Sequence, residues 1–304
     1  MTRQLTGDGW QLQSAFLVDQ NGEVVSQAGF DCADWHGVKT PSTVLCALVK
    51  DGTYPDPRFW PNPFRVPDSS DAFNAEHDLA RYSHLPEGRN PWRDPWWYRT
   101  EFDLPEIGPR QHVWLTINSL NYRADVWVNG MRMADREQLV GMFQRFRLDV
   151  TQAVQAGSNV LAILVHPVDH PGDPDAQLDV YGKVRAFQKD ICNDVTEVMS
   201  IGYDCFPPVP DRNMGLIQEV SLDITGPVDL RDPFVRADLE LPELNPARLT
   251  VSTELINASA ETVSGVLEGT ISGPGGATVA TFSRPTTLLS HQTRTITLTL
   301  ADAT

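Results

Sequence analysis

The stretch Asn121-Tyr-Arg-Ala-Asp-Val-Trp-Val-Asn-Gly130 decides the fold class of this chain. Its middle, residues 124–128, is a short β-branched and aromatic run of the kind that forms strands. Asn129-Gly130 follows at once, and both residues tolerate the positive φ angles of a type I′ turn. The stretch therefore predicts a β-hairpin in which strand 124–128 pairs with a strand that begins at Met131.

Further strand patterns lie on both sides of this hairpin, at residues 113–117 and 159–165. Helical spacing never persists, and 23 prolines and 21 glycines interrupt the chain too often for long helices. One short helix is expected at residues 43–51, capped by Ser42 or Thr43 and ended by Gly52. The proline-rich residues 54–95 are expected to be a long loop, which inside a compact domain is usually functional or disordered.

The composition of the chain changes near Gly226. All eight tryptophans and all six tyrosines precede it. After it, Thr, Val, Leu and Ser alternate in runs at 249–255, 262–271, 278–282 and 293–300, with turn sequences between them. Such spacing is typical of a β-sandwich. We therefore expect an all-β chain of two domains, residues 1–226 and 227–304, the second being an immunoglobulin-like sandwich that lacks its last strand or strands.

The charge of the chain narrows the choice of partners. Its 304 residues include 40 acidic and 24 basic side chains, a net charge of −16. Phosphate backbones and anionic lipids repel such a chain, so neither nucleic acid nor a membrane is expected as a partner. No apolar run reaches the roughly 20 residues that span a bilayer. A neutral or cationic ligand suits this charge, although acidity that only keeps the protein soluble is the simpler interpretation.

The cysteines and the known motifs argue against metal and cofactor chemistry. Cys32, Cys46, Cys192 and Cys205 are widely spaced and form no zinc-ligand pattern. No nucleophile elbow, phosphate loop or dinucleotide fingerprint occurs. We expect no cofactor and no metal. Unpaired cysteines and the absence of a signal peptide favour the cytoplasm, and secretion is the alternative if a signal peptide has been removed.

Aromatic side chains form the first candidate site. Trp97 and Phe102 are expected to hold a strand to the core. Trp60 and Trp92, in the proline-rich segment, are better candidates for a stacking platform, because the C–H faces of sugars lie well on aromatic rings.

The stretch 201–215 is the second candidate site. Asp204 stands among aromatic and proline residues, and Asp211, Arg212 and Asn213 follow. A carboxylate and a guanidinium on a proline-framed backbone can hydrogen-bond vicinal hydroxyls or an amine. The alternative is an ion pair of Arg212 with Asp204 or Asp211 that only closes the loop.

Several motifs follow one another along the chain in a set order. They are Pro41-Ser-Thr-Val-Leu45, Asp51-Gly-Thr-Tyr-Pro-Asp-Pro57, Trp96-Trp-Tyr-Arg-Thr-Glu-Phe102, the stretch 121–130, Gly141-Met-Phe-Gln-Arg-Phe146 and Asp211-Arg-Asn-Met-Gly215. Together they resemble the amino-terminal part of glycoside hydrolase family 2. The last motif and the stretch around Asp204 most resemble exo-β-D-glucosaminidases, with β-mannosidases next.

The resemblance implies a galactose-binding-like jelly-roll sandwich up to about Gly226 and an immunoglobulin-like sandwich after it. In complete family members a (β/α)₈ catalytic barrel follows, which takes about 250 residues. No segment after Gly226 is expected to be helical. We therefore expect neither the barrel nor a catalytic residue in this chain.

The resemblance also implies roles for single residues. Asp204 matches the aspartate of a Trp-Asp-Trp pattern that, in mannosidase-like members, reaches into the pocket of the barrel and holds sugar hydroxyls. Tyr203 and Cys205 stand at the two tryptophan positions, which changes the expected shape of that pocket. Arg212 and Asn213 align with its rim.

The function expected is that of a non-catalytic amino-terminal region of a retaining exo-glycosidase, most like an exo-β-D-glucosaminidase. It would contribute to the substrate pocket and pack on the barrel. The expected partners are a carbohydrate of the terminal β-linked glucosamine or mannose type and the barrel of the same parent protein. The alternatives are a free-standing carbohydrate-binding module, a β-mannosidase fragment and a purely structural scaffold.

Overall fold

The computed structural model describes residues 2–172, 194–196, 209–242 and 247–299. The chain divides into two compact units, Met1–Ile107 with Val113–Asp223, and Gly108–His112 with Ile224–Thr304. We call them the jelly-roll unit and the C-terminal unit. Both consist mainly of β-strands, which confirms the all-β fold class. No helix in the described ranges is long and apolar enough to span a membrane.

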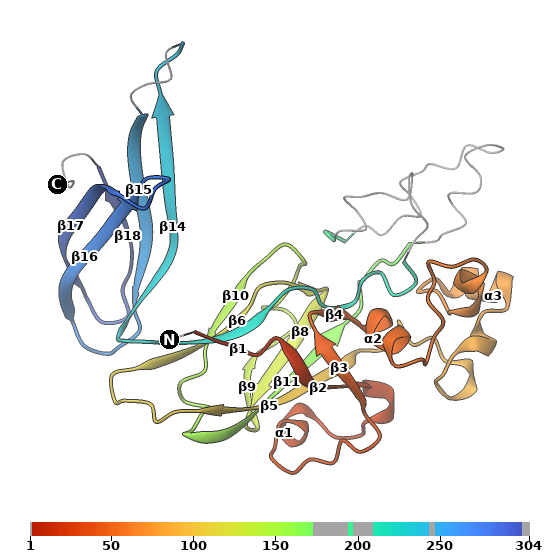
Figure 1. The fold of residues 1–304 in the computed structure, drawn as a ribbon. Helices are drawn as coiled ribbons and strands as arrows, with labels where there is room; N and C mark the ends of the chain where they lie inside the picture. Colours follow the sequence, from red (N-terminus) through yellow and green to blue (C-terminus); the bar gives the residue numbers. More distant parts are fainter. Residues whose placement is uncertain (1, 173–193, 197–208, 243–246, 300–304) are drawn as a thin grey trace. The chain divides into compact units, whose positions relative to one another are not determined.

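The jelly-roll unit is built from antiparallel strands (Figure 1). They are β1 Thr2–Gln4, β2 Gly7–Ser14, β3 His36–Thr40, β4 Ser42–Thr43, β5 Trp96–Leu104, β6 His112–Ile117, β7 Leu120–Asn121, β8 Arg123–Val128, β9 Met131–Ala134, β10 Phe146–Asp149, β11 Gly157–His166, β12 Gly215–Leu216 and β13 Val220–Thr225. The sheets have the orders β3-β2-β5-β11-β8-β9, β1-β13-β6-β10 and β4-β12-β7. The pairing of β1 with β13 joins the two ends of this unit.

The hairpin predicted from Asn129-Gly130 is confirmed. β8 pairs with β9, and Asn129 and Gly130 have φ angles of 50° and 84°. The Asn129 side chain does more than permit the turn, because its Nδ2 donates to Asn159 Oδ1 at 2.8 Å. Its Oδ1 accepts the backbone N–H of Val160, also at 2.8 Å. One asparagine thus ties the hairpin to β11.

Strand β5 lies inside the six-stranded sheet, and its first five residues are all buried. Trp97 and Phe102 are 3% and 5% exposed, which confirms that they anchor this strand to the core. Trp97 packs on Trp127 beside the short helix α1 (Gly22–Val25), with ring centroids 5.4 Å apart. A Cβ on Gly22 would lie 2.2 Å from the Trp127 ring, so only glycine permits this close packing.

The helix predicted at residues 43–51 is α2, Val44–Lys50. Thr43 caps it by accepting the N–H of Cys46 at 3.1 Å. The prediction that residues 54–95 are loop throughout is wrong, because α3 spans Asp71–His77. The short 3₁₀ turns of the unit are η1 Ala15–Leu17, η2 Asn62–Arg65, η3 Ala80–Tyr82 and η4 Pro86–Gly88, and the last three flank α3. The Ser70 side chain caps α3 by accepting the N–H of Phe73 at 3.1 Å.

The C-terminal unit has two sheets, which share one apolar core. Its strands are β14 Val228–Leu239, β15 Ala247–Asn257, β16 Val263–Ser272, β17 Thr278–Leu288 and β18 Thr293–Leu298, in the orders β14-β15-β18 and β16-β17. Its core consists of Leu255, Phe282, Leu288, Ile296 and Leu298. The four predicted strands are confirmed. The sequence does not predict β14, because most of its side chains are exposed and its pairing shifts between Arg231 and Phe234.

Candidate functional site

Three of the motifs singled out in the sequence meet at β12. Gly215 and Leu216 pair with β4 on one side and with β7 on the other. A Cβ on Gly215 would lie 2.6 Å from both the Ser42 carbonyl oxygen and the Tyr98 hydroxyl, and its φ is +149°. Only glycine fits there, so the last residue of the Asp211–Gly215 motif permits the close approach of these strands.

Asp211 fastens this junction to α2. Its Oδ2 accepts the N–H of Leu45 and its Oδ1 accepts the N–H of Asn213, both at 2.9 Å. Burial raises the pKa of Asp211 to about 6, against the opposing effect of these hydrogen bonds. The side chain is 2% exposed, so its partners are protein groups and its role is to shape the turn.

Arg212 is fully buried and forms a two-pronged ion pair with Asp68. Nη2 lies 2.7 Å from Oδ1 and Nη1 lies 2.9 Å from Oδ2. Its Nε donates to the carbonyl oxygen of Pro171 at 2.7 Å. Among the described residues the ion-pair partner of Arg212 is Asp68, which the sequence does not predict. The predicted pair with Asp204 involves a residue outside the described ranges and stays a prediction.

The sequence does not reveal Asp68 as the partner, because the two residues lie far apart in the chain and no local pattern marks one aspartate among many. Because Arg212 is 0% exposed, its guanidinium does not reach the surface, and the predicted contact of this group with a sugar is wrong. Arg212 instead holds the proline-rich segment against the 209–216 stretch.

Asn213 and Asn121 lie next to each other at the junction and differ in exposure. Asn213 is half-buried. Asn121 is fully buried, and its Nδ2 donates to the carbonyl oxygens of Arg212 at 2.8 Å and Asn213 at 3.2 Å. Within the described ranges, Asn121 Oδ1 has no hydrogen-bond partner. A buried acceptor left unpaired costs about 1–3 kcal/mol, so this oxygen is the atom of the junction best placed to gain from a donor.

The two tryptophans predicted to form a stacking platform lie in different surroundings. Trp92 is 1% exposed, and its Nε1 donates to the carbonyl oxygen of Pro67 at 2.5 Å. Its predicted role as a platform is wrong, because the proline-rich segment folds over it and uses it as a core residue. Trp60 is 79% exposed. Its ring is accessible, and its contact with a sugar stays a prediction.

Asp204 and Tyr203 lie outside the described residues, so their contact with a sugar also stays a prediction. The described chain resumes at Val209 and is held by hydrogen bonds. The carbonyl oxygen of Pro210 accepts both the N–H and the Oγ–H of Ser69, at 2.9 and 2.7 Å. The stretch that begins at Val209 is therefore fastened to the proline-rich segment.

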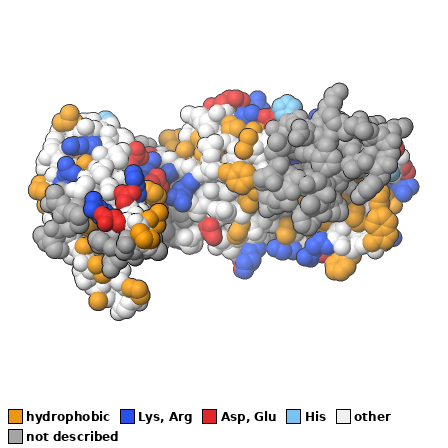
Figure 2. Space-filling model, turned by 90° about the horizontal axis from the view of Figure 1, so that it is seen from above, with side chains coloured by type: hydrophobic (Ala, Val, Ile, Leu, Met, Phe, Trp, Pro, Cys, Tyr) orange, Lys and Arg blue, Asp and Glu red, His pale blue; other side chains and the backbone are white. Residues whose placement is uncertain are grey.

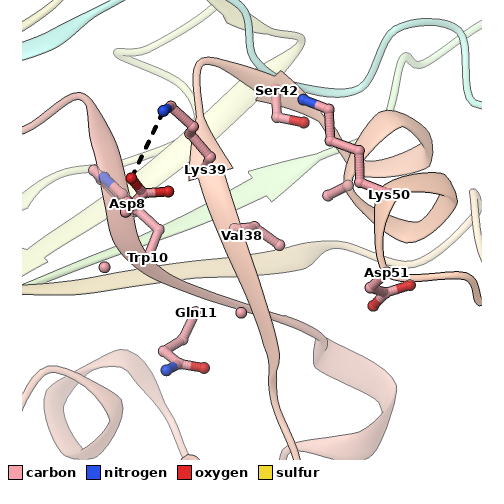
Figure 3. A pocket seen from close by; sticks show the side chains of 11 residues that line it. Asp8, Trp10, Gln11, Val38, Lys39, Ser42, Lys50 and Asp51 are labelled. Atoms are coloured by element: carbon pink, nitrogen blue, oxygen red, sulfur yellow. Dashed lines mark ion pairs between the residues drawn. The ribbon is translucent and has the colours of Figure 1, made fainter.

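Two hollows of the described surface lie on the jelly-roll unit. One, of about 370 Å³, lies between β2, β3 and α2 (Figure 3). On its wall, Lys39 Nζ lies 3.6 Å from Asp8 Oδ2. Charged groups of both signs line it, and its lining includes none of the predicted site residues that the structure describes. The other, of about 420 Å³, adjoins β7 and β12 and includes Phe143, which is 62% exposed. This second hollow borders the junction described above.

The described residues contain no group of His, Cys, Asp and Glu side chains that could hold a metal ion. Cys32 and Cys46 are free thiols. Cys192 and Cys205 lie outside the part of the chain that the structure describes.

These features define a galactose-binding-like β-sandwich with a second β-sandwich unit attached. Residues 79–210 match the family profile described as glycosyl hydrolase 2 galactose-binding domain-like. These residues thus form the galactose-binding-like domain of glycoside hydrolase family 2, which confirms the resemblance seen in the motifs.

Relatives extend the match over both units. The chain is 30% identical to the exo-β-D-glucosaminidase of Streptomyces avermitilis over 97% of its own length and 27% of that protein. It is 30% identical to the mannosylglycoprotein endo-β-mannosidase of Lilium longiflorum over 76% of its length and 22% of that protein. The crystal structure of the Amycolatopsis orientalis exo-chitosanase CsxA matches with a TM-score of 0.72 and 26% identity, over 98% of this chain and 28% of CsxA. The chain thus spans about a quarter of the length of these relatives and matches their amino-terminal region.

Proposed function

We propose that this chain is the non-catalytic amino-terminal region of a retaining exo-glycosidase of the exo-β-D-glucosaminidase type. The observation that carries the proposal is a match along 97% of the chain to about a quarter of such an enzyme. Retaining glycosidases use two carboxyl groups about 5–5.5 Å apart, and in this family both lie on the barrel. The chain supplies a wall of the substrate pocket and a surface on which the barrel packs.

Within this proposal Asp204 is the residue that contacts the sugar, beside Tyr203. The Arg212–Asp68 pair and the Asp211 carboxylate are positioning groups, because they hold the backbone of the 209–216 stretch. Asn213 lies at the rim. A carboxylate forms charge-assisted hydrogen bonds with an ammonium group, so Asp204 suits a glucosamine unit better than a neutral hexose.

The second candidate sugar is mannose. The similarity to an endo-β-mannosidase, at 30% identity over 76% of this chain, favours it. The two candidates differ at carbon 2, where glucosamine carries an ammonium and mannose an axial hydroxyl. Hydrolysis of p-nitrophenyl β-D-glucosaminide and p-nitrophenyl β-D-mannoside by the full-length parent protein distinguishes them directly.

An Asp204→Ala change in the full-length parent protein tests the site. We expect kcat/KM for the preferred glycoside to fall about 100-fold or more, because the lost contact strengthens as the sugar distorts toward the transition state. The exposed carboxylate of Asp19 provides the control, since Asp19→Ala should leave kcat/KM within about twofold. Unchanged hydrolysis by the Asp204→Ala protein would refute the assignment of this residue.

A mixing experiment tests the non-catalytic role of the chain. The chain alone should hydrolyse neither glycoside. Adding it to a separately produced remainder of the parent protein should restore activity that neither piece has. Hydrolysis by the purified chain alone would contradict the proposal.

A further inference from the structure

An exposed group of aromatic rings lies on the proline-rich segment, away from the junction at β12. We call it the aromatic ledge, and it consists of Phe59, Trp60, Phe64, Phe73 and His77. Trp60 is 79% exposed, Phe59 65% and Phe64 36%. Figure 2 shows hydrophobic side chains gathered at the end of the jelly-roll unit that holds α3 in Figure 1. Trp92, from the same segment, is buried in the core, whereas Phe59, Trp60 and Phe64 are exposed and Phe73 and His77 are half-buried.

Four rings of the ledge, those of Trp60, Phe64, Phe73 and His77, are ordered relative to one another around Phe64. The centroid of Phe64 lies 5.3 Å from that of Trp60 with the planes at 83°, and 6.5 Å from that of Phe73 with the planes at 30°. The His77 ring lies 4.3 Å from that of Phe73. In an edge-to-face contact the Trp60 indole keeps most of its area free of Phe64, and its exposure shows that this area faces solvent.

The backbone beneath the ledge is held in place by polar contacts. The Arg58 guanidinium donates to the Asp56 carboxylate, with Nη2 2.6 Å from Oδ2. The side chain of Asn62 donates to the Asp56 carbonyl oxygen at 2.9 Å, and the N–H of Phe64 donates to that of Pro61 at 3.1 Å. Because these contacts already order the turn, binding of a ligand to the ledge costs little conformational entropy of the protein.

We propose that the aromatic ledge binds pyranose rings of a β-linked aminosugar polymer, with Trp60 as the main stacking surface. The size of the ledge favours a sugar over a protein. A stable protein interface covers about 800 Å² on each partner, whereas a single indole offers about 250 Å² at most. Three partly exposed rings match one or two sugar units. The axial C–H bonds of a β-linked hexose give both ring faces an apolar surface for such stacking.

A carboxylate beside the rings supports the choice of an aminosugar. Glu76 is exposed on α3, three residues after Phe73 and directly before His77. Residues three apart on a helix are neighbours on its surface, so the carboxylate lies near the rings and can pair with an ammonium group. The choice of polymer rests on the proposed function, whereas the stacking rests on the ledge alone.

The test uses the chain by itself and two soluble ligands, chitohexaose in its fully deacetylated, cationic form and cellohexaose, which is neutral. Binding is followed by titration calorimetry at low salt and at high salt, about 0.5 M NaCl. We expect Trp60→Ala to weaken binding of the cationic hexamer about tenfold or more at both salt concentrations. Trp60→Phe should recover part of that loss, and Glu76→Gln should weaken the cationic hexamer selectively.

Two matched variants test whether binding depends on the ledge in particular. Phe234→Ala removes another exposed aromatic ring, 62% exposed against 79% for Trp60, from the C-terminal unit and should bind as the unchanged chain does. Asp19→Ala removes an exposed carboxylate outside the ledge and should also bind as the unchanged chain does. The ledge is read from binding by the chain alone and the proposed function from hydrolysis by the parent protein, so their failures give different results. Circular dichroism and Tm of each variant verify that it folds.

Three outcomes would overturn the proposal. The first is that the unchanged chain binds neither oligosaccharide. The second is that Trp60→Ala binds as tightly as the unchanged chain. The third is that the cationic hexamer binds only at low salt and binds equally well to the Trp60→Ala variant. The net charge of −16 alone would then account for the attraction.

Discussion

Arg212 and Asp68 are a pair of opposite charges, 0% and 5% exposed at their side chains, that face each other in the interior. Removing both charges from solvent costs several kcal/mol, which the two parallel hydrogen bonds offset only while both partners remain. The same pair joins the proline-rich segment to the stretch that carries the junction. The pair therefore both stabilises the fold and positions the 209–216 stretch against the proline-rich segment.

Asp68→Asn should lower the free energy of unfolding by about 3–5 kcal/mol, because it leaves the Arg212 guanidinium buried beside a neutral amide. Arg212→Met combined with Asp68→Leu should cost less than that single change. Asp78→Asn, which breaks an exposed pair with Arg81, should cost less than about 1 kcal/mol. Urea unfolding measures all three. A loss below about 1 kcal/mol for Asp68→Asn would show that the buried pair is not needed.

At the scale of elements, local patterns located most of the fold. The hairpin at Asn129-Gly130 and the helix α2 are short, and each is set by a turn or cap residue that its neighbours in sequence reveal. The sequence analysis missed α3, although Ser70 caps it as Thr43 caps α2, because the surrounding prolines favoured a loop. The Asn74 side chain accepts the N–H of Asp68 at 2.7 Å and donates to its carbonyl oxygen at 2.6 Å. A single Asn in a proline-rich segment gives no sign of these bonds.

The hairpin allows a prediction at this scale. Asn129→Gly keeps the positive φ but loses the side-chain bonds to Asn159 and Val160, and we expect it to lower the free energy of unfolding by about 1–3 kcal/mol. Asn129→Asp keeps the acceptor for the Val160 N–H but sets a carboxylate oxygen against the Ala153 carbonyl oxygen and Asn159 Oδ1, each 2.8 Å from the present Nδ2, so it should cost at least as much as the glycine change. Thermal unfolding followed by circular dichroism measures both. A glycine variant as stable as the unchanged protein would mean that only the turn conformation matters.

At the scale of the whole molecule, the half-buried His84 and the buried Asp211 couple stability to pH in opposite directions. Burial lowers the pKa of His84 to about 4 from its ordinary 6.5. The unfolded chain therefore takes up a proton that the folded chain refuses as the pH falls from 6.5 to about 4, which destabilises the fold. Burial raises the pKa of Asp211 to about 6 from its ordinary 3.8. The folded chain keeps a proton that the unfolded chain releases, so this group destabilises the fold as the pH rises from 3.8 to about 6.

The two opposite slopes should nearly cancel in the unchanged protein between about pH 4 and pH 6.5. In Asp211→Asn the effect of His84 remains, and stability should rise with pH across this window. In His84→Asn the effect of Asp211 remains, and stability should fall with pH by up to about 3 kcal/mol, since one pKa unit corresponds to about 1.36 kcal/mol. Urea unfolding at intervals across the window checks both. Slopes of the same sign in the two variants would contradict the assignment.

The sequence by itself determined the all-β class, the hairpin, the family and the change of composition between the two units, because these depend on turn residues, short-range alternation and ordered motifs. Only the tertiary structure decided which residues reach solvent and which pair at long range. It buried Trp92 and Arg212, left Trp60 exposed, and chose Asp68 as the partner of Arg212. Burial and pairing depend on how distant segments close over one another, and residues 144 positions apart leave no mark of that in either local pattern.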